Sequence, residues 1–243
     1  GSRSTDPDRT LLVEASMASI RPFCGYGGAS IPEVRSLAGL PQQRSGSRLE
    51  VAARARMREV SRELHKAKGL GAVLAIAERH QDIFHSEPAA AVLALHRLAA
   101  YAGTAAEGSG EASQRREIGG GAPSRLREAA ARLGADVGDL GVLAPKQWSQ
   151  YVWAAARLSE GVDAISAATP EVLASRMPTM VPQNVVNVLW AFASVSVHGG
   201  DAEASVALLA HEAARVAGEL AAQELAAAMW ALAPLGRACA IVE

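Results

Sequence analysis

Basic residues between positions 44 and 68 form the pattern best suited to chemistry in this sequence, and that chemistry is phosphate binding. The segment holds eight basic residues against three acidic ones. Long cationic side chains on one helix face can contact successive phosphates of a nucleic acid, and counterion release supplies the affinity. A solvated helix face without a ligand is the alternative interpretation. The eight residues are Arg44, Arg48, Arg54, Arg56, Arg58, Arg62, Lys66 and Lys68.

A second, weaker group of basic residues surrounds the Gly-rich sequence at 119–121. Its arginines have the same cationic chemistry as those of the first group. We expect a weaker contribution to phosphate binding from this group. Its members are Arg115, Arg116, Arg125, Arg127 and Arg132.

Catalytic and metal-binding patterns are missing. His211 and Glu212 begin a sequence similar to the zinc motif HExxH, but Arg215 stands where the second His is required to chelate the ion. The sequence GYGG at 25–28 lacks the Lys and Ser or Thr of a phosphate-binding loop. Two cysteines near opposite ends are too few for a disulfide framework or a metal cluster. We therefore expect a protein that is not an enzyme and uses no metal or cofactor.

The basic stripe needs a helix to position it, and the sequence from Leu49 predicts one. Apolar residues from Leu49 to Leu64 recur at helical spacing, and Arg54, Arg58 and Arg62 fall on roughly the opposite face. Glycines at 69 and 71 interrupt the pattern. A second helix is expected over 70–80, and a third after Ser86 with Pro88 in its first turn.

A repeat organises the C-terminal half. The pattern PxxxxxxxWAxAxx occurs around Trp153 and Trp190, and Trp230 carries a third copy that lacks the Pro. The tryptophans are 37 and 40 residues apart. A fixed period in this range is typical of stacked helical hairpins. The segment ALHRL, aligned with AAARL, places Leu93 at the Trp153 position. We predict an all-α fold, an α-solenoid of stacked helical hairpins with an extended N-terminal arm.

Composition divides the chain into four parts. Residues 1–48 are rich in Gly, Pro, Ser and Arg and read as an extended arm. Residues 49–101 are N-terminal helices with a basic face. Residues 102–124 are a Gly-rich insertion or linker. Residues 125–243 carry the hairpin repeats.

The repeat tryptophans have two interpretations. Large rings flanked by Ala fill the space between adjacent hairpins, so we expect Leu93, Trp153, Trp190 and Trp230 to form the repeat core. Stacking of exposed rings on RNA bases is the alternative. Trp148 lies outside the repeat register and is the better surface candidate.

Polar residues near the start of each Trp helix form the third group of candidates. Equivalent positions in an α-solenoid line one face, where amides can hydrogen-bond to base edges. Helix capping and solvation are the alternative. The residues are Lys146 and Gln147, then Gln183, Asn184 and Asn187, then Gln223 and Glu224.

The repeats resemble a known family. QNVVNVLWAFASV and QELAAAMWALAPL are similar to octotricopeptide-type repeats. AVLALHRLAAY, with LGAVLAIAERHQDIF before it, resembles a segment of heptatricopeptide or RAP-domain proteins. The resemblance covers about 61–101 and 140–240. It implies binding of organellar RNA in maturation, translation or ribosome assembly. This sequence carries no RAP domain, its repeats are few, and the last two are acidic.

Charge separates the two halves. Residues 159–243 carry −6 and residues 1–158 carry +5, so a polyanion should prefer the N-terminal half. Taken with the resemblance, which implies organellar RNA, we expect a non-catalytic RNA-binding protein of the mitochondrial matrix, a structural or assembly component of the mitochondrial ribosome. Its partners would be rRNA and, through the acidic repeats, neighbouring proteins. The alternatives are a protein–protein scaffold of another organellar complex and a plastid location. The sequence has no apolar run long enough to span a membrane.

Overall fold

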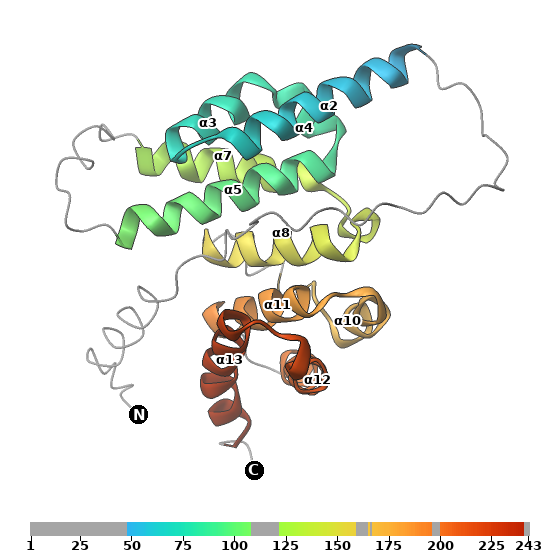
Figure 1. The fold of residues 1–243 in the computed structure, drawn as a ribbon, viewed down its shortest axis with the longest axis vertical. Coiled ribbons are helices and arrows are strands. Elements are labelled where there is room, and N and C mark those ends of the chain that lie inside the picture. Colours follow the sequence, from blue (N-terminus) through green and yellow to red (C-terminus); the bar gives the residue numbers. More distant parts are fainter. Residues whose placement is uncertain (1–47, 108–121, 159–164, 166, 196–199, 241–243) are drawn as a thin grey trace, which may run out of the picture.

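The computed structural model describes residues 48–107, 122–158, 165, 167–195 and 200–240 (Figure 1). Every regular element in these ranges is a helix, so the predicted all-α class is confirmed. The expected arm, apart from the first residue of α2 at Arg48, lies outside the described residues. No helix in the described ranges combines the length and apolar character needed to cross a membrane.

The N-terminal half packs around α5. Helix α2 contacts α3 and α5, and α7 contacts α3, α4 and α5. Gly69, between α2 and α3, has φ +98°, a conformation that side-chain-bearing residues rarely adopt, so the chain turns there at little cost. The helices are α2 (Arg48–Lys66), α3 (Leu70–Arg79), α4 (Gln81–Ser86), α5 (Pro88–Glu107) and α7 (Ala122–Val137).

Prolines mark the helix starts of the C-terminal half. Pro145, Pro170 and Pro182 each begin a helix, where the missing N–H costs nothing because that group has no helical acceptor. The helices are α8 (Pro145–Arg157), α10 (Pro170–Arg176), α11 (Pro182–Val195), α12 (Gly200–Arg215) and α13 (Ala222–Ala240). Short 3₁₀ turns lie at η1 (Leu140–Val142), η2 (Met177–Thr179) and η3 (Ala217–Glu219).

Helices α5, α8, α11 and α13 form a row. Each contacts the next in that order, and Figure 1 shows α5, α8 and α11 one below another. Helix α12 packs against α11 and α10, on one side of the row. The row thus joins the basic N-terminal half to the Trp-bearing helices.

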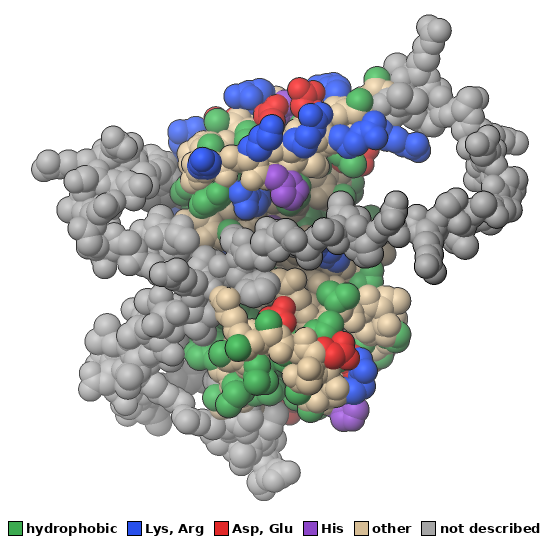
Figure 2. Space-filling view, in the orientation of Figure 1, with side chains coloured by type: hydrophobic (Ala, Val, Ile, Leu, Met, Phe, Trp, Pro, Cys, Tyr) green, Lys and Arg blue, Asp and Glu red, His purple; other side chains and the backbone are tan. Residues whose placement is uncertain are grey.

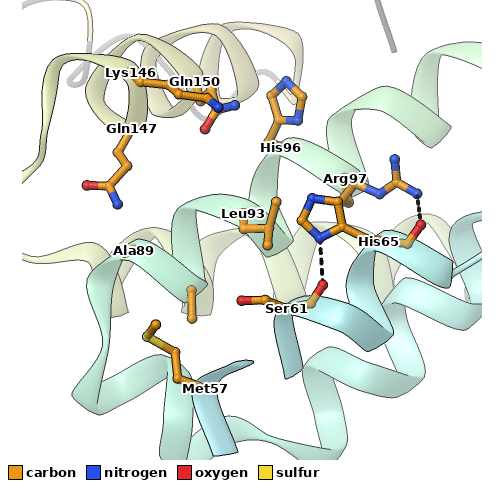
Figure 3. Close-up of a pocket in the computed structure, with 11 residues that line it drawn as sticks. Met57, Ser61, His65, Ala89, Leu93, His96, Arg97, Lys146, Gln147 and Gln150 are labelled. Atoms are coloured by element: carbon orange, nitrogen blue, oxygen red, sulfur yellow. Dashed lines mark hydrogen bonds between the residues drawn. The ribbon is translucent and has the colours of Figure 1, made fainter. Parts of the chain in front are cut away.

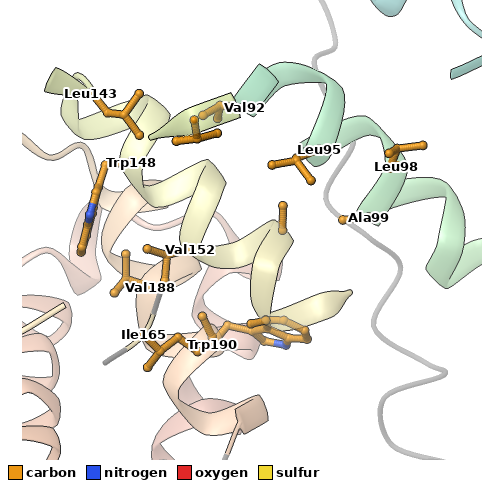
Figure 4. Packing of buried hydrophobic residues seen from close by; sticks show 14 of the residues in the cluster. Val92, Leu95, Leu98, Ala99, Leu143, Trp148, Val152, Ile165, Val188 and Trp190 are labelled. Atoms are coloured by element: carbon orange, nitrogen blue, oxygen red, sulfur yellow. The ribbon is translucent and has the colours of Figure 1, made fainter. Parts of the chain in front are cut away.

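One apolar cluster runs through the row. Figure 4 shows side chains of this cluster on successive helices, with Val92 and Leu95 on α5 and Val152 of α8 beside Val188 of α11. Alanines at each contact, such as Ala154, permit close approach of the backbones. The buried face of each helix fixes its rotation, and so decides which side chains remain outside.

The helices differ from the sequence prediction at several boundaries. Residues 81–86 form the separate helix α4, which was not predicted. Helix α5 continues to Glu107 and α7 begins at Ala122, so both ends of the expected linker 102–124 are helical. Helix α12 ends at Arg215, and η3 follows. The Ala-rich composition at 102–107 favours helix despite the Gly at 103.

Candidate nucleic-acid interface

The basic stripe of α2 is exposed. Arg54, Arg58, Arg62 and Lys66 lie on the outer side of the helix, while Val60 and Leu64 are buried against the rest of the protein. Figure 2 shows Lys and Arg side chains gathered over α2 at the top of the molecule. We call the exposed residues Arg54, Arg58, Arg62 and Lys66 the α2 basic face.

Acidic residues near α2 form ion pairs with basic residues outside the α2 basic face. Arg56 bonds to Asp82 of α4 at 3.0 Å, and so holds α2 against α4. Glu63 of α2 pairs with Arg79 and His80 rather than with the α2 basic face. Within the described ranges, no ion pair is found for Arg54, Arg58, Arg62 or Lys66. Their charge is therefore available to a polyanion.

Other predicted basic residues are less favourably placed, or not described. Arg125 bonds to Glu78 of α3 at 2.7 Å, and this hydrogen bond raises the pKa of Arg125. Arg127, on the same helix, is exposed, and so is Lys68 after α2. Arg44, Arg115 and Arg116 lie outside the described residues, and so does the side chain of Arg48.

Aromatic rings form a continuous line along the row. The centroids of His96 and Trp153 are 5.0 Å apart, those of Trp153 and Trp190 6.0 Å, and those of Trp190 and Trp230 6.2 Å. We call these four rings the aromatic line. Arg157 places its guanidinium 5.6 Å from the Trp153 ring and 6.0 Å from the Trp190 ring. Such contacts suit cation–π attraction.

The aromatic line begins at a residue that the sequence alignment did not single out. The ring of His96 lies against that of Trp153, whereas the alignment of ALHRL with AAARL placed Leu93 at the Trp153 position. Leu93 is half-buried against the core, on the same face. Sequence reasoning missed His96. The signal for it was its position three residues after Leu93, which places both on one side of a helix.

Exposure separates the four tryptophans. Trp190 is 7% exposed, and Trp153 and Trp230 are half-buried against the core. Trp148 is 1% exposed, so its prediction as a surface residue was wrong. Its ring packs under Arg176, whose guanidinium lies 5.3 Å from the ring centroid. The guanidinium donates to the carbonyl of Leu140, in η1, and to that of Leu143, just after η1.

The polar residues at the helix starts divide by role. The Gln147 Oε1 accepts from the Ala144 N–H at 3.0 Å, and the Glu224 Oε2 accepts from the Ala221 N–H at 2.9 Å, so both cap their helices. Asn184 is 5% exposed and cannot offer its amide to a base. The accessible members of the group are Lys146 and Gln223, exposed, and Gln183 and Asn187, half-buried.

A groove of about 540 Å³ lies beside the α2 basic face. Helix α2 supplies Met57, Ser61 and His65 to one wall, α8 supplies Lys146, Gln147 and Gln150 to the other, and α5 forms the floor (Figure 3). We call it the α2–α5–α8 groove. Sequence reasoning did not find it, because even the nearest residues of its two walls, His65 and Lys146, are 81 positions apart in the chain (146−65), and only packing brings them together.

His96 lines this groove as a neutral ring. Burial, and then the charges of Arg97 and Lys146, lower the pKa of His96 from 6.5 to about 4. At neutral pH the imidazole therefore adds no charge, and its ring lies against Trp153. His65, at the α2 wall, is exposed, and its Nδ1–H donates to the Ser61 carbonyl at 2.6 Å.

The described residues contain no group of three or more His, Cys, Asp or Glu side chains that could hold a metal ion. Glu212, in the sequence similar to a zinc motif, instead bonds to Arg215 through both carboxylate oxygens. That hydrogen bonding lowers the pKa of Glu212. The side chains at this position thus form a surface ion pair.

Comparison with protein-family models, curated proteins and solved structures finds no match to this chain. A proposal about function therefore rests on the geometry of α2, of the groove and of the aromatic line.

Proposed function

We propose that this protein is a non-catalytic RNA-binding protein that holds the RNA backbone on the α2 basic face. The supporting observation is the exposure of Arg54, Arg58, Arg62 and Lys66 without acidic partners among the described residues. Their helix is anchored from behind, since Val60 and Leu64 are buried. Because the backbone of α2 is already ordered, binding of phosphates to these cations does not cost backbone conformational entropy, which favours binding.

We further propose that α5, α8, α11 and α13 form a short α-solenoid. Their sequential contacts and the aromatic line support this arrangement, because each ring bridges neighbouring helices of the row. Helix α12, packed on α11 and α10, would belong to the second layer of such a stack. The tryptophans then serve as packing between hairpins, and Arg157 joins two of them.

The RNA that we propose is rRNA in a mitochondrial ribosome, with a plastid ribosome as the alternative. This assignment rests on the resemblance of the repeats and ALHRL segment to organellar RNA-binding proteins. The small number of repeats supports a structural role, since few repeats can read only a short sequence. The α2 basic face needs no sequence specificity to fulfil that role.

A protein-docking role for the C-terminal half has its own supporting observation. Leu225 and Met229 of α13 are 40% and 65% exposed, respectively. Residues 159–243 carry −6, which disfavours RNA at this end. As the second candidate function, we propose that this end meets neighbouring proteins, whether or not α2 holds RNA.

The RNA proposal is tested by neutralising two arginines of the α2 basic face. We expect Arg54→Gln with Arg58→Gln to weaken binding of labelled mixed-sequence single-stranded RNA about tenfold or more in low salt. The slope of log affinity against log salt should fall by about 1.4, from roughly 0.7 per phosphate contact. Fluorescence anisotropy over a KCl series measures both quantities.

A matched control removes the same charge elsewhere. Arg215→Gln with Arg237→Gln neutralises two arginines of the C-terminal half, on α12 and α13, away from the α2 basic face. We expect this variant to retain most of the affinity and the slope. Equal losses in the two variants would show that net charge, and not the α2 basic face, holds the RNA.

A further inference from the structure

We infer that the α2–α5–α8 groove receives the base of one unpaired nucleotide of the bound RNA, an inference that rests on the proposed function. The groove opens beside the α2 basic face, so that a backbone held there can turn one base inward. This assigns a role to residues that the phosphate-binding proposal leaves unused.

The size and floor of the groove suit a base. Its volume of about 540 Å³ lies within the range of roughly 300–1,000 Å³ typical of small-molecule sites. Figure 3 shows Ala89 and Leu93 of α5 between Met57 of α2 and the glutamines of α8. These apolar side chains offer a surface for the flat face of a base, without selecting among bases.

The polar wall can read the edge of that base. Gln150 carries an amide with both donors and acceptors, and it lines the groove from α8. Gln147 uses its Oε1 to cap its own helix, which leaves its NH₂ group as a donor. Amides at this depth match the exposed Watson–Crick edge of an unpaired base.

The groove is continuous with the cationic residues of α2. Met57 and Ser61 line it, and Arg58 and Arg62 each follow one position later, about 100° further around the helix. On the opposite wall, Lys146 lies in the first turn of α8, where the helix dipole favours an anion. The phosphates on either side of an inserted base would thus meet positive charge at both rims.

His96 links groove occupancy to a measurable signal. Its ring lines the groove and its centroid lies 5.0 Å from that of Trp153. The charged groups around it, Arg97 and Lys146, favour its neutral form, and His65 lies across the groove. A base placed against His96 should therefore change the fluorescence of Trp153.

The test uses the full chain and single-stranded RNA homopolymers labelled at one end. We expect Gln150→Ala to weaken binding of at least one homopolymer about fivefold, the worth of one hydrogen bond to a base. Ala89→Phe, which fills the floor, should weaken binding of all four. Neither variant should change the salt slope, because neither removes a phosphate contact. Gln81→Ala, an exposed glutamine of α4, is the matched control and should leave binding unchanged.

Intrinsic fluorescence provides an independent readout. Titration with RNA should change the tryptophan emission of the wild-type chain, and Trp153→Phe should remove most of that change while RNA affinity is retained. Circular dichroism of each variant establishes that it is folded. If Ala89→Phe misfolds, the inference is tested by Gln150→Ala, which removes atoms and adds none, and by the tryptophan emission of the wild-type chain.

Two outcomes would overturn the inference. The groove holds no base of the RNA if Gln150→Ala binds every homopolymer like Gln81→Ala and the Trp153→Phe chain responds like the wild type. It is a site for free nucleotides instead if nucleoside 5′-monophosphates change the emission but RNA affinity survives Ala89→Phe. The proposed function survives both outcomes provided that the Arg54→Gln, Arg58→Gln variant loses RNA. If that variant keeps its RNA affinity, the proposed function itself fails.

Discussion

His96 is a titratable residue whose surroundings differ strongly between the folded and unfolded chain. Its imidazole lies between Trp153 and the charges of Arg97 and Lys146, and burial is the main reason that its pKa falls from 6.5 to about 4. Between those values the unfolded chain binds a proton that the folded chain excludes. The free energy of unfolding must therefore fall as the pH falls through this window.

We predict that this one residue costs about 1–3 kcal/mol of stability between pH 7 and pH 4, since one pKa unit corresponds to about 1.4 kcal/mol. Urea unfolding at a series of pH values measures the slope. His96→Gln, which cannot become charged, should show a weaker pH dependence over the same interval. If the two chains lose stability in parallel, His96 does not carry the effect and carboxylates elsewhere must.

Single residues also show where sequence reasoning reaches its limit. The repeat predicted which helices carry Trp153, Trp190 and Trp230, because their spacing is a property of the chain. It could not predict that His96 contacts Trp153, since the displacement of α5 along α8 depends on how their side chains interlock. The burial of Trp148 follows from Arg176 and η1, which lie on other segments.

At the scale of elements, Arg97 of α5 fixes the end of α2. Its guanidinium donates to the carbonyls of Leu64 and Ala67 at 3.1 Å, and to the Tyr101 hydroxyl at 3.1 Å. Tyr101 in turn donates to the Ala67 carbonyl at 2.6 Å. The last carbonyls of a helix have no helical donor, so these bonds satisfy them. The position of the α2 basic face therefore depends on a residue of another helix.

We predict that Arg97→Met lowers the free energy of unfolding by about 2 kcal/mol, because it keeps the apolar stem and removes charge-assisted hydrogen bonds. Amides in the last turn of α2 should exchange faster with deuterium, and mass spectrometry locates the change. Arg215→Met, which removes an exposed arginine paired with Glu212 on α12, is the control and should leave that turn unchanged. Unaltered exchange in Arg97→Met would show that packing of Val60 and Leu64 suffices to hold α2.

The sequence predicted the principal elements and failed at their boundaries. Proline at a first turn and apolar periodicity indicated the starts of α5, α8 and α11, because both act within one turn of helix. The separation of α4 from α3 was not visible in the same way. His80 breaks the helix with φ −114°, and Ile83 and Phe84 of α4 are then buried against the core.

At the scale of the whole molecule, charge and packing divide the chain differently. The charge changes sign near residue 158, whereas the apolar cluster and the aromatic line continue across that point. The basic and acidic halves are thus joined by the contact of α8 with α11, and by the hydrogen bonds of Arg176 to the carbonyls of Leu140 and Leu143. If the row behaves as a solenoid, a binding event at one end reaches the other through these contacts.

Trp190 lies at the contact of α8 with α11. It is 7% exposed and contacts Trp153 of α8 on one side and Trp230 of α13 on the other. We predict that Trp190→Ala lowers the free energy of unfolding by about 3–5 kcal/mol. In a row of nearest-neighbour contacts the halves should then unfold separately, so that chemical denaturation followed by far-UV circular dichroism shows two transitions.

Trp230→Ala provides the comparison, since Trp230 is half-buried and contacts one ring at the end of the aromatic line. It should cost less and leave a single transition. In the Trp190→Ala variant under mild denaturant, the amides of α2 to α8 should stay protected from deuterium exchange after those of α11 to α13 have lost their protection. A single transition with uniform exchange would contradict a row in which each helix is stabilised mainly by the helices next to it. It would instead mean that the helices unfold as one cooperative globule, in which the repeat describes sequence without governing stability.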